Sequence, residues 1–271
     1  PELPSFNLYM ENVAGIMQKG QTYSDVAVYV PYEDGVMKGA YPPERQRVWV
    51  WGEYELRYVF PPEELEGYHP LWINRHFLNE SDYVDGKLKV GDATFSLLYI
   101  DVNYMDIRAL QRVLELAKMG LPVCLKNNPS EPGMQKSKDY HDMLQSLIGL
   151  GNVSKELKQL IKHEPLLSGD MLPEYWCRVG GDGAHYLFLA HPLSKGLKYP
   201  IYSGQSKIDT LMKVPLKISV NNVAINEIIV FKPYQSVILK IGPNGDLDYL
   251  NIEFVPKDPI VREREKQRMN F

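Results

Sequence analysis

The stretch FSLLYIDVNYMDIRALQRVLELAKMGLPVCLKNNPSEPG, residues 95–133, predicts the fold of the chain around it. Its first six residues, 95–100, are mostly apolar, and they suit a short strand buried on both faces. From 107 to 117 apolar side chains recur at helical spacing, with charged side chains turned away from them. This pattern indicates a buried strand followed by an amphipathic helix.

The signals that end this helix lie directly after it. Gly120 suits the position past the last turn, and Pro122 prevents continuation. Residues 121–125 then have the composition of a second buried strand. Strand, crossover helix and strand at this spacing predict a right-handed parallel unit of an open α/β sheet.

Composition describes an ordinary water-soluble chain with room for two cores. The 271 residues are 44% hydrophobic and 24% charged. A net charge of −4 and a pI of about 5.9 give no electrostatic reason to expect nucleic acid or an anionic membrane as a partner. No apolar run approaches the roughly 18 residues needed to span a bilayer, so no membrane partner is expected. Cys124 lies inside a predicted buried strand, where packing is the simplest role for a thiol.

Periodicity divides the chain into four segments. Residues 1–22 contain an amphipathic helix, 6–19, which could be the last helix of a preceding domain. Residues 23–168 alternate strand and helix patterns, whereas 169–260 contain short strand candidates separated by turn residues. We therefore expect an α/β domain followed by an antiparallel β-sandwich. Residues 261–271 form a charged tail.

Binding candidates follow the first predicted strand, at the strand end where open α/β sheets usually bind ligands. Tyr32, Glu33 and Asp34 lie in the expected loop 31–35, and the carboxylates could bind a cation or sugar hydroxyls. A solvated or capping role remains the alternative for both carboxylates. Asp101 and Asn103 follow a second strand in the same way, where capping of the next helix by Asn103 or Asp106 is the alternative.

Aromatic side chains supply another candidate surface. Trp49 and Trp51 alternate with valines in an expected irregular excursion, 37–51, and could stack on a sugar ring. Packing against a neighbouring domain explains them equally well.

Recognisable catalytic and metal-binding patterns are missing from the sequence. The six histidines have no HExxH or related spacing, and no GxSxG, GxGxxG or GxxxxGK[ST] motif occurs. We therefore expect no metal and no cofactor, and we assign no catalytic residue.

Several segments together resemble the carboxyl-terminal part of a bacterial glycoside hydrolase of the α-L-rhamnosidase-like family 106. The segments are FNLYMENVAGIMQKGQTYSDVAVYVPYEDGVM, the stretch 95–133, YLFLAHPLSKGLKYPIYSGQ and FKPYQSVILKI. The resemblance implies a class I glutamine amidotransferase-like (flavodoxin-like), three-layer α/β domain followed by a β-sandwich. It also implies a catalytic barrel before this chain, whose last helix would be 6–19.

That resemblance implies a non-catalytic accessory role in polysaccharide degradation. The partner would be the catalytic barrel of the same secreted or periplasmic protein, with carbohydrate and a second copy of the chain as further partners. An independent carbohydrate-binding module is the alternative function. A self-contained α/β hydrolase is a third, which the missing nucleophile elbow argues against.

Overall fold

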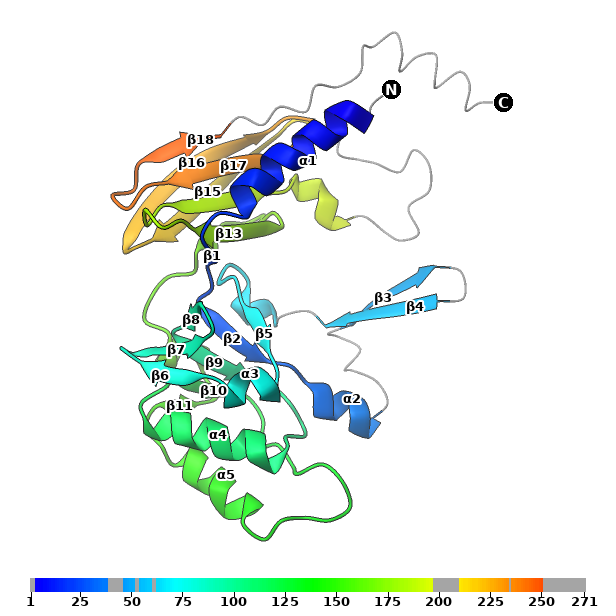
Figure 1. Ribbon diagram of the computed structural model, residues 1–271, viewed down its shortest axis with the longest axis vertical. Coiled ribbons are helices and arrows are strands. Elements are labelled where there is room, and N and C mark those ends of the chain that lie inside the picture. Colours follow the sequence, from blue (N-terminus) through cyan, green and yellow to red (C-terminus); the bar gives the residue numbers. More distant parts are fainter. Residues whose placement is uncertain are drawn as a thin grey trace.

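The computed structural model describes residues 3–38, 46–51, 54–59, 62–196, 210–233 and 235–250, with the backbone alone at 38, 46–51, 54–59, 195 and 196. The described residues form a mixed α/β structure with a parallel sheet and several antiparallel sheets. Figure 1 shows two parts, which we call the α/β unit, around the parallel sheet, and the β unit, with α1 (Leu3–Met17) lying across it.

The α/β unit is built on a five-stranded sheet in which every pair of neighbours is parallel. From one edge to the other its strands are β11 (Val153–Ser154), β10 (Val123–Leu125), β9 (Leu97–Ile100), β2 (Val26–Tyr29) and β5 (Leu71–Ile73). The strand–helix–strand unit expected from residues 95–125 is confirmed, since β9 and β10 are adjacent and parallel and α4 (Ile107–Lys118) connects them.

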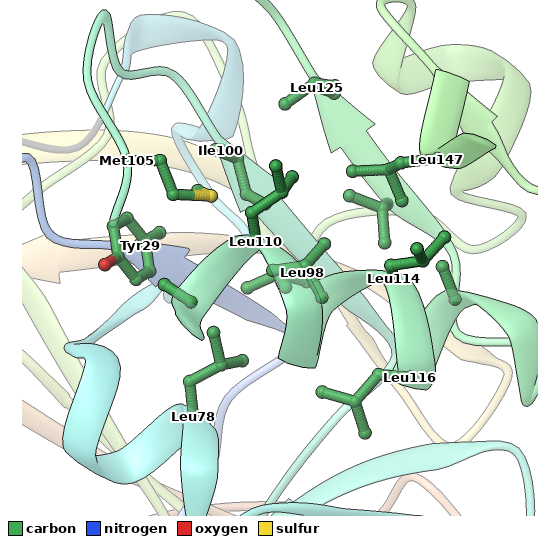
Figure 2. Close-up of a cluster of buried hydrophobic side chains, with 14 of the residues drawn as sticks. Tyr29, Leu78, Leu98, Ile100, Met105, Leu110, Leu114, Leu116, Leu125 and Leu147 are labelled. Carbon is green, nitrogen blue, oxygen red and sulfur yellow. The ribbon is translucent and has the colours of Figure 1, made fainter. Parts of the chain in front are cut away.

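One face of the sheet packs against α4, α3 (Arg75–Asn79) and α5 (Tyr140–Ile148). Asp106 begins α4, where its carboxylate accepts the backbone N–H of Arg108 at 2.9 Å, so the expected capping role is confirmed for this residue. Figure 2 shows Leu110 and Leu114 of α4 lying over Leu98 of the sheet. The apolar stripe seen in the sequence is therefore the face that buries the sheet.

The opposite face of the sheet is covered by shorter elements. These are the 3-10 helix η2 (Glu63–Leu65) and α6 (Leu157–Leu160), which pack on side chains from β2, β9 and β10. Cys124 belongs to this cluster and is fully buried, which confirms its packing role. Burial raises the pKa of its thiol to about 12, so the group is unreactive near neutral pH.

Two small antiparallel sheets accompany the α/β unit. β6 (Asp82–Val84), β7 (Lys87–Val90) and β8 (Ala93–Phe95) form a meander directly before β9. β3 (Gln46–Trp51) and β4 (Tyr54–Val59) pair as a hairpin. The irregular excursion expected at 37–51 is therefore wrong for 46–51, where cross-strand pairing gives a regular strand.

The β unit contains two antiparallel sheets that share one core. The first sheet is β1 (Gln21–Thr22), β13 (Tyr175–Val179), β14 (His185–Leu189), β17 (Val237–Ile241) and β18 (Leu247–Tyr249). The second is β12 (Leu167–Ser168), β15 (Met212–Val220) and β16 (Val223–Phe231), and η3 (Pro192–Gly196) follows β14. The core includes Leu187 and Leu239 from the first sheet and Ile218 and Phe231 from the second.

One local expectation is wrong. Residues 31–35 do not form a loop, because α2 (Tyr32–Lys38) begins there with two carboxylates in its first turn, which the positive end of a helix favours. Residues 71–73 form a strand because they pair with β2. Ser154 lies in β11, and Glu156 precedes α6. The charged tail at 261–271 lies outside the described residues.

Candidate functional site

The carboxyl-end edge of the parallel sheet holds the predicted binding residues Glu33 and Asp34. Asp34 is 1% exposed, and its carboxylate accepts the backbone N–H of Asn103 at 3.0 Å and that of Tyr104 at 2.7 Å. The side-chain amide of Asn103 adds a third donor at 2.8 Å. The structure thus brings Asp34 and Asn103 together, as partners of each other.

Glu33 is also buried against the chain itself. Its Oε1 accepts the hydroxyl of Tyr29 at 2.9 Å and, more weakly, the backbone N–H of Asp106 at 3.4 Å. Its Oε2 is buried without a hydrogen-bond partner among the described residues. Burial, followed by the charge of Glu33, raises the pKa of Tyr29, so this phenol stays protonated and donates.

The remaining predicted site residues make no hydrogen bond to Glu33 or Asp34 within the described part of the chain. Tyr32 is 63% exposed on the first turn of α2. Trp49 and Trp51 lie in β3, and their side chains fall outside the described part of the chain. Asn127 donates to Asp101 at 2.6 Å, so these polar residues too bind one another.

A polar cleft lies at the opposite edge of the sheet, at the amino ends of its strands. It has a volume of about 700 Å³ and lies between the two units. The segment 21–25, which leads into β2, forms one part of it, and Lys162, His163 and Glu164 form another. The β unit contributes Lys217, Ser219 and the turn at Asn221 and Asn222. These residues come from distant parts of the sequence.

Asp25 is a buried carboxylate in this cleft. It is 6% exposed, and its Oδ1 accepts the hydroxyl of Tyr23 at 2.7 Å and lies 3.3 Å from Nε2 of His163. Oδ2 is buried without a hydrogen-bond partner among the described residues. Burial and then the charge of Asp25 raise the pKa of Tyr23, so the phenol remains a donor to this carboxylate.

Two buried histidines lie close to Asp25, and one of them, His69, joins the two units. Nε2 of His69 accepts the backbone N–H of Cys177 at 3.4 Å, and the His69 backbone N–H donates to Tyr175 at 2.9 Å. The ring of His185 packs edge-on against Tyr23, with 5.3 Å between ring centroids. Burial lowers the pKa of both histidines, although Asp25 acts in the opposite direction, so each is favoured in its neutral form.

This cleft was not predicted from the sequence. The sequence shows only an Asp directly before a strand, in Tyr23-Ser24-Asp25, and nothing local links it to His163 or to the turn at Asn221. No group of His, Cys, Asp and Glu suited to a metal ion occurs among the described residues. Within the same residues, no helix combines the length and the apolar character needed to cross a membrane.

Comparison with known proteins assigns no relative. No family model matches the chain, and neither curated proteins nor solved structures give a match.

Proposed function

We propose that this chain is the non-catalytic, carboxyl-terminal accessory region of a polysaccharide-degrading glycoside hydrolase. In this proposal an amidotransferase-like, flavodoxin-like three-layer α/β domain is followed by a β-sandwich, in a secreted or periplasmic protein. Numbered in chain order, the parallel strands run 2-1-3-4-5 across the sheet, which is the order of flavodoxin-like folds. Helices on both faces and a core shared by two antiparallel sheets support the same assignment.

The observation that carries the proposal is how the side chains at the carboxyl ends of the parallel strands are bonded. In a 2-1-3-4-5 sheet the ligand crevice lies where the connections diverge, here between β2 and β9. Asp34 and Asn103 lie at those two strand ends and satisfy each other. Of the two carboxylates at this edge, Asp34 is saturated by the chain's own donors, which suits a scaffold better than a catalytic centre, whereas Oε2 of Glu33 is buried without a partner among the described residues.

The exposed apolar surface of α1 supports docking of this chain on a neighbouring domain. Leu3, Phe6, Leu8 and Met10 are between 46% and 67% exposed, and no residue of the helix is buried. Exposed apolar side chains of this kind are typical of a surface that a neighbouring domain covers. In the proposal that domain is the catalytic barrel, and Tyr32 on α2 is the residue able to contact its substrate.

The test begins with the coding sequence on the 5′ side of the Pro1 codon. We expect it to encode a barrel with a pair of carboxylates spaced for glycoside hydrolysis, roughly 5 to 9 Å apart. Removing residues 1–271 from that longer protein should lower the thermal stability of the barrel, and the chain alone should not hydrolyse aryl glycosides. Turnover by the chain alone, or a preceding sequence without a barrel, would refute the accessory role.

A further inference from the structure

We propose that the cleft between the two units is a binding site for a neutral, hydroxyl-rich ligand, a sugar, anchored on the carboxylate of Asp25. This inference does not depend on the accessory role, because it rests on the lining of the cleft alone.

Asp25 supplies an unused acceptor at the base of the cleft. Tyr23 and His163 both face Oδ1, which leaves Oδ2 buried without a partner among the described residues. A buried carboxylate oxygen without a donor is unfavourable, so a ligand hydroxyl placed there is bound strongly. Oδ2 has almost no exposed area, so the proposal requires the carboxylate to rotate toward the cleft before a ligand hydroxyl can reach it.

A second unused polar atom lies on the wall formed by the β unit. Ser219 lines the cleft, and its Oγ is buried without a hydrogen-bond partner among the described residues. A serine hydroxyl both donates and accepts, as a sugar hydroxyl does. The two units therefore each bring an unsatisfied group to the same cleft.

The charges of the lining argue for a neutral ligand. The cations are Lys87, Lys162 and Lys217, and the anions are Asp25, Asp92 and Glu164. Lys217 and Glu164 neutralise each other at 2.6 Å. With three charges of each sign, the lining favours neither a phosphate nor a polyamine.

The other lining groups match several hydroxyls at once. Amides come from Gln21, Asn221 and Asn222, and hydroxyls from Thr22 and Thr94. An amide can donate to one hydroxyl and accept from its neighbour, which suits the adjacent hydroxyls of a sugar ring. A volume of about 700 Å³ lies in the usual range for small-molecule sites.

The experiment measures binding of the full chain to a printed array of neutral oligosaccharides, with the best binder then titrated by calorimetry. Asp25→Asn should raise Kd about tenfold or more, because a charge-assisted hydrogen bond is lost. Asn222→Gly should raise Kd more modestly, and since Asn222 has φ +64°, glycine keeps the backbone conformation. Glu131→Gln is the matched control, a buried carboxylate whose oxygens bind Ser137 instead, and it should leave Kd unchanged.

Circular dichroism confirms that each variant is folded, and Asn222→Gly provides the test if Asp25→Asn does not fold. Three outcomes overturn the proposal. These are no binding to any neutral glycan, binding unaffected by the two cleft variants, and tighter binding of inorganic phosphate or spermidine than of every glycan. None of them bears on whether a catalytic barrel precedes the chain, so the two proposals fail separately.

Discussion

The carboxylate of Asp34 accepts both the backbone N–H and the side-chain amide of Asn103, at 3.0 and 2.8 Å. Asp34 lies in α2, which follows β2, and Asn103 follows β9, so this contact joins the ends of two neighbouring strands. The side chain of Asp34 therefore links the segments that follow β2 and β9 at this edge of the sheet.

Asp34→Asn should therefore destabilise the protein. The amide has one acceptor oxygen in place of two, and it leaves a backbone N–H of Asn103 or Tyr104 without its partner. We expect a loss of about 1–3 kcal/mol in the free energy of unfolding, measured by urea denaturation. Asp248→Asn, on the exposed strand β18, should change it by less than about 0.5 kcal/mol. Equal effects of the two substitutions would contradict the structural role of Asp34.

Gly67 should be irreplaceable because the two units approach closely there. It has φ +89°, and a Cβ at this position would lie 2.1 Å from the carbonyl oxygen of Leu167. Gly86 has φ +75° with open space around it, so Gly86→Ala measures the backbone strain alone, about 1–3 kcal/mol. Gly67→Ala should lower the free energy of unfolding by at least about 1 kcal/mol more than Gly86→Ala does, as measured by thermal or urea denaturation. A Gly67→Ala variant as stable as Gly86→Ala would show that the units are not packed as described.

Arg178 should protect the segment that follows α1. Its guanidinium donates to the carbonyls of Lys19 and Gly20, at 3.1 and 2.5 Å, and to the hydroxyl of Thr22 at 2.5 Å. Arg178→Gln removes these bonds, and cleavage after Lys19 by endoproteinase Lys-C should become faster by roughly fivefold. Arg108→Gln, on the exposed side of α4, is the control and should leave the rate unchanged. Mass spectrometry identifies the site, and an unchanged rate for Arg178→Gln speaks against the anchor.

Stability should fall on mild acidification because of His69 and His185. Burial lowers the pKa of both below the ordinary 6.5. In the unfolded chain each takes up a proton as pH falls through about 6.5, whereas the folded protein binds it only at lower pH. Between these values the unfolded state holds more protons, so the free energy of unfolding decreases as pH falls. The slope is at most about 1.4 kcal/mol per pH unit for each histidine.

Urea denaturation at pH 7.5 and pH 5.5 measures this dependence. The double variant His69→Gln/His185→Gln removes both groups, and its stability should change less between the two pH values than that of the parent protein. An undiminished difference would assign the acid sensitivity to other groups.

The exposed face of α1 should tolerate polar substitution. Phe6 and Leu8 are 48% and 59% exposed, so Phe6→Gln/Leu8→Gln should lower the fluorescence of bound ANS with a stability change below about 0.5 kcal/mol. Leu110→Ala in the core is the contrast, since this fully buried side chain should cost about 2–5 kcal/mol. A large loss of stability in the α1 variant would mean that this face is already packed.

Local patterns in the sequence predicted the elements that depend on local chemistry. The helix expected at 107–117 is α4, capped by Asp106 and ended next to Gly120, and the strand expected at 121–125 is β10. α2 was missed because Pro31 and Gly35 are typical of turns, although two carboxylates in its first turn favour a helix. β5 was missed because its strand conformation depends on pairing with β2.

Of the two candidate sites, one could be located from local sequence and the other depends on tertiary packing. Position after a strand was enough to single out Glu33 and Asp34, but it could not reveal that Tyr29 and Asn103 already engage them. The cleft could not be predicted, because Asp25, His163 and Ser219 become neighbours only when the two units pack. No periodicity or spacing in the sequence indicates that these three residues lie near one another.

The two shortest strands of the β unit make its fold discontinuous along the chain. Gln21 pairs with Val179, and Leu167 pairs with Ile218, so the whole α/β unit is inserted between β1 and β12. During synthesis the α/β unit can fold first, while β1 waits on the growing chain until residue 179 has left the ribosome. Docking of that edge strand is then a late event, and it draws the inserted unit against the β unit as it occurs. The α/β unit is therefore tied to the β unit at both of its ends.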